Sequence, residues 1–395
     1  MAAALEGLKV LDLSRYIAGP FAAQIFGDLG ADVVKVERLD GGEEGRRVGE
    51  LVDGETLFFM SANRNKRSLT IDFRNPEGQE LLRALASKAD VLIENFRPGT
   101  MEKMGCGWDV LSAINPRLVM VRISGFGQDG PLAQHPCFDG AAQALSGVMS
   151  QTGHPEGAPT MTGVFVCDYG TALYATIAAL AALRARDQTG RGQVVEATLM
   201  ESGMSMLTTA IPERILFGRE MTRYGNRDRY LSPSHCFQSG DRQWIYVVAG
   251  NDDHFPRFAR AMGRPDLIDD PRFKTFVDRN RNVAALEQII DAWGASVSGE
   301  EALRLIHAAD VPCERVSTIA DVIEHPQVKH RAQIVDVPHA GGAVPFQAPA
   351  FRMHDTPPEV RRGAPALGEH TDAILDEWLG MAGEKIATLR ANAAI

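Results

Sequence analysis

Asp168 is the residue whose position most favours chemistry, because it stands between a short apolar segment and a long apolar helix. Val164, Phe165 and Val166 are β-branched or aromatic and predict the end of a strand. Residues 171–183 carry no charge and are rich in Ala and Leu, which is typical of a buried helix. At the N-cap or in the first turn of this helix, the carboxylate faces backbone N–H groups that favour its ionised form. Such a carboxylate can act as a nucleophile, although a simple helix cap is the commoner role of Asp there.

The cysteines and histidines offer no competing centre. The five cysteines are widely spaced, their number is odd and no CxxC pair occurs, so neither a disulfide framework nor a zinc site is expected. Cys167 adjoins Asp168, but strand alternation predicts that its side chain points away, and packing is the favoured role of a small buried cysteine. The histidines fit no metal-ligand spacing, and no metal is expected.

Basic residues in the first third of the chain suit a phosphate-bearing ligand. They are Arg38, Arg64, Lys66, Arg67, Arg74, Arg97 and Lys103. We expect their loops to meet at one rim of a parallel sheet, in a chain whose net charge is −10. For any single residue of the run a solvated surface charge is the better explanation, and for Arg38 it is an equal one. Asn95 and Phe96 end a strand, so we expect an amide and an aromatic ring to face the same ligand, with core packing as the alternative for the ring.

Strands and helices alternate in the first half of the sequence. The expected strands span 8–13, 32–37, 91–93 and 118–123, and the expected helices span 21–29 and 77–89. This alternation predicts an α/β fold with a parallel sheet, helices on both faces and a ligand at the carboxyl ends of the strands. The turn after the first strand, LSRYIAGP, occupies the place of a dinucleotide fingerprint but lacks GxGxxG. A nicotinamide dehydrogenase is therefore disfavoured.

The character of the sequence changes after about residue 216. A strand at 244–248 and helices at 255–262, 283–293 and 300–309 predict a smaller α+β domain. Residues 338–365 are rich in Pro and Gly and predict an extended strap, which a helix at 373–379 follows. We expect a large α/β domain over 1–215, to which 335–395 returns, and a small domain over 216–334.

Charge and hydropathy argue against several partners. The net charge of −10 disfavours nucleic acid. The first residues lack a basic segment followed by an apolar one, so no signal peptide is expected. The longest uncharged apolar stretch, 170–183, is shorter than a membrane span. We expect a reduced, cytoplasmic protein that does not bind membranes.

Six segments, in order along the chain, resemble the family III CoA-transferases, which include formyl-CoA and carnitine CoA-transferases. The segments are GLKVLDLSRYIAGPFAAQIFGDLGADVVKVER, NRNKRSLTIDFRNPEG, ADVLIENFRPG, VCDYGTALYA, TGRGQ and LGEHTD. The resemblance implies a large Rossmann-like parallel-sheet domain, a smaller α+β domain and an interlocked homodimer. It also implies coenzyme A, carried as an acyl-CoA, and a small carboxylic acid as the substrates.

The resemblance also implies roles for individual residues. It places the family nucleophile on Asp168. The coenzyme-contacting positions are Arg38, Arg74, Asn95, Phe96 and Lys103, to which the basic run adds Arg97. The substrate pocket is expected to contain Tyr16, Ile17, Asp139, Tyr169 and Gly170, of which Asp139 matches a carboxylate that lines the family site. Ile17 replaces a glutamine of the formyl enzyme, so the resemblance does not carry over oxalate or formate as the substrate.

Covalent catalysis follows from the resemblance. The Asp168 carboxylate attacks the donor acyl-CoA to give a mixed anhydride, and the released CoA thiolate then attacks the aspartyl carbonyl. This leaves an aspartyl-CoA thioester, which the acceptor acid consumes by the reverse sequence. The helix N-terminus favours the ionised carboxylate by about 0.3–1 kcal/mol. The backbone N–H groups of Tyr169 and Gly170 are expected to stabilise the tetrahedral oxyanion.

Two related classes of protein stay open at this point. An α-methylacyl-CoA racemase of the same superfamily would carry a histidine before Asp139, where this chain has Phe138, and a phenylalanine cannot act as a base. A non-catalytic CoA-binding homologue would keep the fold and lose the nucleophile turn, which this chain retains.

Overall fold

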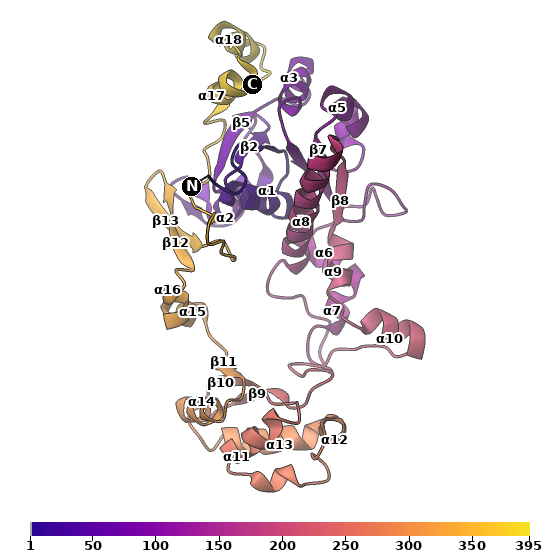
Figure 1. The fold of residues 1–395 in the computed structure, drawn as a ribbon, viewed down its shortest axis with the longest axis vertical. Helices are drawn as coiled ribbons and strands as arrows, with labels where there is room; N and C mark the ends of the chain where they lie inside the picture. The colour runs from indigo at the N-terminus through magenta and orange to yellow at the C-terminus, as the bar shows by residue number, and fades with distance from the viewer. Residues whose placement is uncertain (1) are drawn as a thin grey trace. The chain divides into compact units, whose positions relative to one another are not determined.

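The large sheet contains six parallel strands whose order turns back once. A computed structural model describes residues 2–395, and Figure 1 shows its elements. The strands are β1 (Lys9–Asp12), β2 (Asp32–Glu37), β5 (Lys66–Thr70), β6 (Val91–Glu94), β7 (Val119–Ser124) and β8 (Val194–Thr198). They lie in the order β5-β2-β1-β6-β7-β8, and each neighbouring pair is parallel. The predicted parallel α/β sheet is confirmed, and its order reverses between β1 and β6, as in dinucleotide-binding folds.

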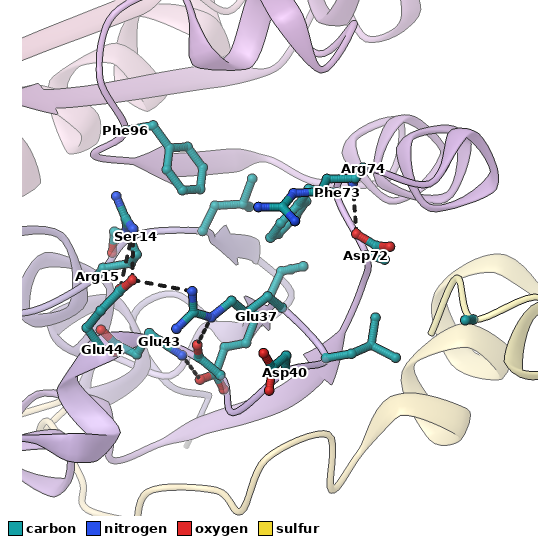
Figure 2. Close-up of a pocket in the computed structure, with 16 residues that line it drawn as sticks. Ser14, Arg15, Glu37, Asp40, Glu43, Glu44, Asp72, Phe73, Arg74 and Phe96 are labelled. Carbon is teal, nitrogen blue, oxygen red and sulfur yellow. Dashed lines mark hydrogen bonds and ion pairs between the residues drawn. The ribbon is translucent and has the colours of Figure 1, made fainter.

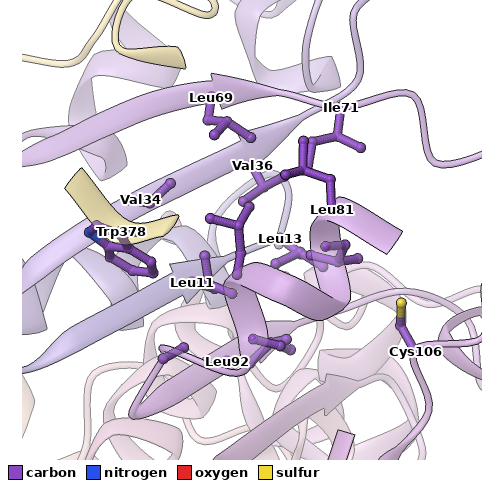
Figure 3. Packing of buried hydrophobic residues seen from close by; sticks show 14 of the residues in the cluster. Leu11, Leu13, Val34, Val36, Leu69, Ile71, Leu81, Leu92, Cys106 and Trp378 are labelled. Atoms are coloured by element: carbon purple, nitrogen blue, oxygen red, sulfur yellow. The ribbon is translucent and has the colours of Figure 1, made fainter. Parts of the chain in front are cut away.

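Helices cover both faces of this sheet. Successive residues of each strand point to opposite faces, so the apolar side chains form two separate cores, one under each layer of helices. The helices are α1 (Ala18–Asp28), α2 (Leu57–Asn63), α3 (Pro76–Ala86), α4 (Thr100–Lys103), α5 (Trp108–Ile114), α6 (Asp139–Ser146), α8 (Val166–Thr189), α9 (Leu199–Ser205), α17 (Thr371–Leu379) and α18 (Gly383–Ala391). Val10 and Val33 belong to the core beneath α1 and α8. Leu11 and Val34 belong to the opposite core, where Leu81 of α3 and Trp378 of α17 also lie (Figure 3). The sheet is therefore buried on both faces, as parallel sheets require.

Helix α8 differs from the expectation at its start. Residues 164 and 165 form no strand, and the helix begins at Val166. By length and composition α8 could cross a membrane, but half of its most apolar stretch is buried inside the protein. Its small residues Ala172, Ala175 and Ala179 pack into the core that α1 shares. These properties fit a core helix of the large sheet.

The end of the chain packs onto the large sheet. Trp378 is 4% exposed, and its Nε1 donates a hydrogen bond to Asp32 Oδ2 at 2.9 Å. Arg67 of β5 pairs with both Asp32 and Glu377, at 2.6 and 2.7 Å. The segment before these helices is not wholly extended, because β12 (Ile334–His339) and β13 (Gly342–Gln347) form an antiparallel hairpin.

The contacts between residues divide the chain into two units. The first contains 1–148, 162–208 and 327–395, and the second contains 149–161 and 209–326. The predicted small domain, 216–334, overlaps the second unit, which also takes in 149–161 and begins at Thr209. Short elements complete the chain: β3 (Leu51–Val52), β4 (Glu55–Thr56), α7 (Val148–Gln151), α16 (Pro326–His330) and the 3-10 helices Glu44–Arg47 and Pro265–Ile268.

The second unit is built on a small antiparallel sheet. Its strands β9 (Ser234–Gln238), β10 (Trp244–Val248) and β11 (Cys313–Arg315) lie in the order β11-β10-β9. Its helices are α10 (Ala210–Phe217), α11 (His254–Ala261), α12 (Phe276–Arg281), α13 (Val283–Gly294), α14 (Gly299–Ala308) and α15 (Ile319–Glu324). Phe237, Ile245, Phe258 and Ile290 form a core of its own. The strand and helices expected from 244 to 309 are confirmed.

Replacing Trp378 by Ala should lower the free energy of unfolding by about 3–5 kcal/mol, because the change opens a cavity in the core and leaves Asp32 without its indole partner. Urea denaturation followed by circular dichroism measures this. Trp244→Ala is the control, since Trp244 is 50% exposed and its loss should cost much less. Equal losses in the two variants would mean that the last helices do not support the large sheet.

Candidate active site

A crevice lies where the strand order reverses, at the carboxyl ends of β1 and β6. In open α/β sheets this is the position at which ligands bind. Two cavities of about 440 and 250 Å³ occupy it, and both are lined by Arg15, which follows β1, and Phe96, which follows β6. The guanidinium carbon of Arg15 lies 5.2 Å from the centre of the Phe96 ring. The two cavities therefore adjoin at this pair.

The larger cavity combines cations with aromatic surface (Figure 2). Arg38 and Arg74 both line it, as do Phe73 and Phe96, whose rings are 6.2 Å apart in an edge-to-face arrangement. Arg38 Nε donates to the carbonyl oxygen of Gly42 at 2.6 Å. Guanidinium groups suit phosphate oxygens, and flat aromatic rings suit a purine. These groups suit a nucleotide, and the same cavity is also lined by the carboxylates of Glu37, Asp40, Glu43, Glu44 and Asp72.

The smaller cavity contains Asp168. The other predicted site residues in its wall are Tyr16, Ile17, Asn95, Phe96 and Arg97. Much of the remaining lining is apolar, from Ala18, Ile123, Pro136, Phe138 and Leu199. The structure thus brings a carboxylate, a cation and an apolar wall together beside the nucleotide-sized cavity. Lys103 lies elsewhere: it is exposed at the end of α4 and lines neither cavity.

Asp168 does not cap its own helix. It is the third residue of α8, the N-cap position belongs to Phe165, and no side chain of this segment supplies a cap. Asp139, at the start of α6, supplies it instead: its Oδ1 accepts the backbone N–H groups of Cys167 at 2.7 Å and Asp168 at 3.1 Å. Gln143 fixes the other oxygen of Asp139 through a hydrogen bond of 2.5 Å. The Asp168 carboxylate is left available to a ligand.

The helix end does not keep the pKa of Asp168 low, contrary to expectation. Burial, followed by the nearby charge of Asp139, raises the pKa of Asp168 to about 7. A helix N-terminus favours the ionised form by only about 0.3–1 kcal/mol. Desolvation therefore outweighs the helix dipole, and the carboxyl group changes charge near neutral pH.

Comparison with known proteins shows the family to which the chain belongs. The profile of CoA-transferase family III matches residues 5–371. The chain belongs to the family III CoA-transferases. It is 38% identical to the beta subunit of succinyl-CoA–L-malate CoA-transferase from Chloroflexus aurantiacus, over 99% of this chain and 98% of that one. It is 33% identical to formyl-CoA:oxalate CoA-transferase from Streptomyces avermitilis, over the full length of both.

A solved structure agrees with the sequence comparison. The crystal structure of a CAIB/BAIF family protein from Brucella suis is 35% identical, covers 96% of this chain and all of its own, and superimposes with a TM-score of 0.85. The protein is therefore an acyl-CoA:carboxylate CoA-transferase, which moves CoA between an acyl-CoA and a carboxylic acid. A racemase and a non-catalytic CoA-binding protein are disfavoured accordingly.

Tyr169 and Gly170 of the CoA-transferase are both engaged within the fold. The N–H of Tyr169 donates to the carbonyl oxygen of Phe165 at 3.0 Å, so the helix already uses it. A Cβ on Gly170 would lie 2.5 Å from Ser202 Oγ and 2.5 Å from Met206 Cε, so this glycine permits close packing of α8 on α9. The Tyr169 N–H is therefore not free to stabilise an oxyanion, and the oxyanion role of the Gly170 N–H stays a prediction.

Part of the basic run of the transferase also has a different role. Arg64 pairs with Asp28, Lys66 with Asp12 and Arg67 with Asp32, and these basic side chains are largely or wholly buried. They hold the sheet to its neighbouring segments and do not line the two cavities. The sequence shows charge but not the partner that neutralises it, which here lies about 35 to 55 residues away along the chain.

Among the lining residues of the transferase that sequence reasoning missed are Arg15, His135 and Cys137. Arg15 lies within the LSRYIAGP turn, so that motif could have indicated it as a lining residue.

Burial, followed by the charges of Asp168 and Asp139, raises the pKa of Cys137 to about 11. Cys167 is buried, as expected, but it packs from the helix against Gly203 of α9. Among residues 2–395, no group of three or more His, Cys, Asp and Glu side chains could hold a metal ion.

Asp168→Asn should make the protein more stable than the wild type above pH 7. The folded state binds the Asp168 proton more tightly than the unfolded chain does, so the free energy of unfolding falls as pH rises from 3.8 to about 7. Asparagine does not titrate. The difference should grow from near zero at pH 4 to about 2 kcal/mol at pH 8, roughly half of the full shift because solvent screens the carboxylate. Urea denaturation at each pH measures it, and a difference that stays constant with pH would contradict the raised pKa.

Proposed function

We propose that Asp168 is the nucleophile that exchanges one thioester for another. The carboxylate attacks the thioester carbonyl of the donor, which expels CoA thiolate and leaves a mixed anhydride. The thiolate then attacks the aspartyl carbonyl, which forms an aspartyl-CoA thioester and releases the donor acid. The acceptor carboxylate runs the same two steps in reverse, so one thioester is broken for each one formed. The observation that carries the proposal is the position of Asp168 in the wall of a cavity that adjoins the nucleotide-sized one.

The coenzyme is proposed to lie along the crevice. Its phosphates meet Arg38 and Arg74 in the larger cavity, and its adenine contacts the aromatic wall that Phe73 and Phe96 provide. The pantetheine arm passes Arg15 and Phe96, which line both cavities, and brings the thioester to Asp168. A pKa near 7 suits the nucleophile, because a carboxylate that is poorly solvated is more basic than one in water and still ionises at neutral pH.

We propose a dicarboxylic acyl donor, of which succinyl-CoA is the simplest choice. The proteins named as similar include succinyl-CoA:glutarate CoA-transferases from mouse and human, which are 33% and 34% identical to this chain. Arg97 and His135 line the cavity of Asp168 and can face a second carboxylate on the acyl group. The apolar Ile17 and Phe138 suit the methylene carbons between the two carboxylates.

Rapidly quenched reactions with succinyl-CoA, analysed by mass spectrometry of peptides, should carry CoA as a thioester on Asp168. Hydroxylamine should remove the adduct, and Asp168→Ala should abolish both the adduct and turnover. Cys137→Ser is the control for the neighbouring nucleophile and should keep the adduct, because the protonated Cys137 thiol is unreactive. An adduct on Cys137, or product formation with no adduct, would overturn the mechanism.

Comparing succinyl-CoA with acetyl-CoA, and malate and glutarate with oxalate and aromatic acids, tests the substrate class. Higher kcat/KM for the four- and five-carbon dicarboxylates supports the dicarboxylate proposal, and a preference for acetyl-CoA or aromatic acids contradicts it. Exchange of deuterium at the α-carbon without transfer would point to racemisation instead.

We further propose that a second copy of this chain covers the outer face of α8. Leu173, Tyr174 and Ile177 are 51%, 45% and 62% exposed, although the helix carries the nucleophile at its start. Leu145 of α6 is 53% exposed, and α6 packs against α8. Such a stripe of large apolar side chains is unfavourable in water and marks an interface. A homodimer buries it without requiring a different partner.

Light scattering after size exclusion should show a dimer of 85.8 kDa, twice the chain mass of 42.9 kDa, at micromolar concentration. Ile177→Asp should give a monomer, because it places a charge in the proposed interface. Ile114→Asp, which changes a 44% exposed isoleucine at the end of α5, is the control and should remain dimeric. A monomeric wild type, or co-sedimentation of the monomer with phospholipid vesicles, would contradict the dimer.

A further inference from the structure

The turn that joins β1 to α1 lies in the walls of both cavities. Side chains outside residues 14–16 form hydrogen bonds with each consecutive backbone N–H and carbonyl group from Ser14 N to Tyr16 N. Ser14 and Arg15 line the larger cavity, and Arg15 and Tyr16 line the smaller one. The bonds are Ser14 N to Asp12 Oδ1 at 2.9 Å, Lys35 Nζ to Ser14 O, Arg15 N to Asn95 Oδ1 at 2.9 Å, Asn95 Nδ2 to Arg15 O at 2.8 Å, and Tyr16 N to Glu43 Oε2 at 2.7 Å. Five consecutive polar groups of the main chain are thus fixed by four side chains.

The conformation of this turn is one that the chain would not adopt unaided. Tyr16 has φ 66°, in the left-handed region that residues with a side chain avoid. Its ring lies edge-on to Phe138, with centroids 5.3 Å apart, in the wall of the Asp168 cavity. The shape of the cavity therefore depends on whatever holds Tyr16 in this conformation. Glu43 does so directly, through the backbone N–H of Tyr16.

Lys35 lies behind Glu43 and is fully buried. Its Nζ lies 3.0 Å from Glu43 Oε1 and 3.6 Å from Asp12 Oδ2, and it donates to the Ser14 carbonyl oxygen. Burial alone would lower the pKa of Lys35, but the charges of Asp12 and Glu43, with a smaller contribution from Glu37, raise it, so the ammonium group persists. Lys35 lines neither cavity, and no step of the proposed transfer uses it.

We propose that Lys35 is a positioning residue of CoA transfer, which holds Ser14 and Glu43 so that the turn over 14–16 keeps the shape that Asp168 and the acyl group require. The proposal rests on the proposed role of Asp168. Without the ammonium group, the Ser14 carbonyl loses its donor and Glu43 loses the cation that orients it. The turn then relaxes from the left-handed conformation, and Arg15 and Tyr16 move relative to Asp168. A displacement of about 1 Å is sufficient to lower a rate by about 10²-fold.

Lys66 provides a matched control. It is the same residue type, is equally buried and pairs with the same Asp12, at 2.7 Å. Its other hydrogen bonds go to Asn63 Oδ1 and the Pro20 carbonyl oxygen, and none of these bonds reaches residues 14–16. Lys35→Met and Lys66→Met therefore remove the same kind of buried charge. Only the first removes a donor that contacts the turn directly, because Lys66→Met leaves Lys35 beside Asp12.

Steady-state kinetics with succinyl-CoA and an acceptor acid, together with thermal unfolding, test the proposal. In Lys35→Met, kcat should fall about 10- to 100-fold while the KM for the acyl-CoA changes less than about 3-fold. In Lys66→Met, kcat should stay within about 3-fold of the wild type, although the midpoint of unfolding falls in both variants. Parallel losses of kcat in the two variants, or an unchanged kcat in Lys35→Met, would overturn the proposal.

The double variant Lys35→Met with Glu43→Gln tests whether a lower kcat in Lys35→Met results only from unfolding. It removes both charges of this ion pair, so neither an unpaired cation nor an unpaired anion is left buried there. It should fold better than Lys35→Met and still show at least a 10-fold lower kcat, since the Ser14 carbonyl has no donor. Full recovery of kcat would also overturn the proposal. These comparisons use turnover alone, so a wild type without an Asp168 adduct would refute the nucleophile and leave the difference between Lys35 and Lys66 intact.

Discussion

The site depends on the carboxylate of Asp168, which is largely buried beside the carboxylate of Asp139. Asp139 accepts the first N–H groups of α8 and so performs the capping that Asp168 would otherwise perform. Asp168 is left with an open carboxylate whose proton is retained until about neutral pH. The same contact thus fixes the backbone of the proposed nucleophile and makes its charge costly. A nucleophile of this kind gains basicity from its surroundings and needs no separate base beside it.

The rest of the first unit serves to keep that arrangement rigid. The strand order reverses between β1 and β6, and the residues that follow these two strands form the walls of both cavities. Asn95 illustrates the difference between lining a site and touching a ligand. It was expected to present its amide to the coenzyme, and the structure shows that amide bonded twice to the backbone of Arg15. A polar side chain at a strand end can therefore shape a crevice by holding a neighbouring loop.

Much of the fold could be predicted from local pattern. Alternating strands and helices led to the parallel sheet, and uncharged residues around 171–183 led to α8, because both signals are periodic over short distances. The site residues came from the family resemblance and from strand ends, and Arg38, Arg74, Phe96 and Asp168 do lie around one crevice. The errors concern interactions that join distant parts of the chain. No local sequence pattern near Asp168 predicts that a residue 29 positions earlier caps its helix. Likewise, no local pattern near Lys66 predicts its ion pair with Asp12.

The thiol of Cys137 lies in the same wall as Asp168 and could compete with it for the acyl group. An acyl group that moved from the coenzyme to a cysteine would form a thioester of similar energy, and the enzyme would be trapped in a self-acylated state. With a pKa of about 11, only about one Cys137 in ten thousand carries the reactive thiolate at pH 7. Burial, followed by the charges of Asp168 and Asp139, thereby keeps protonated the sulfur that could divert the acyl group.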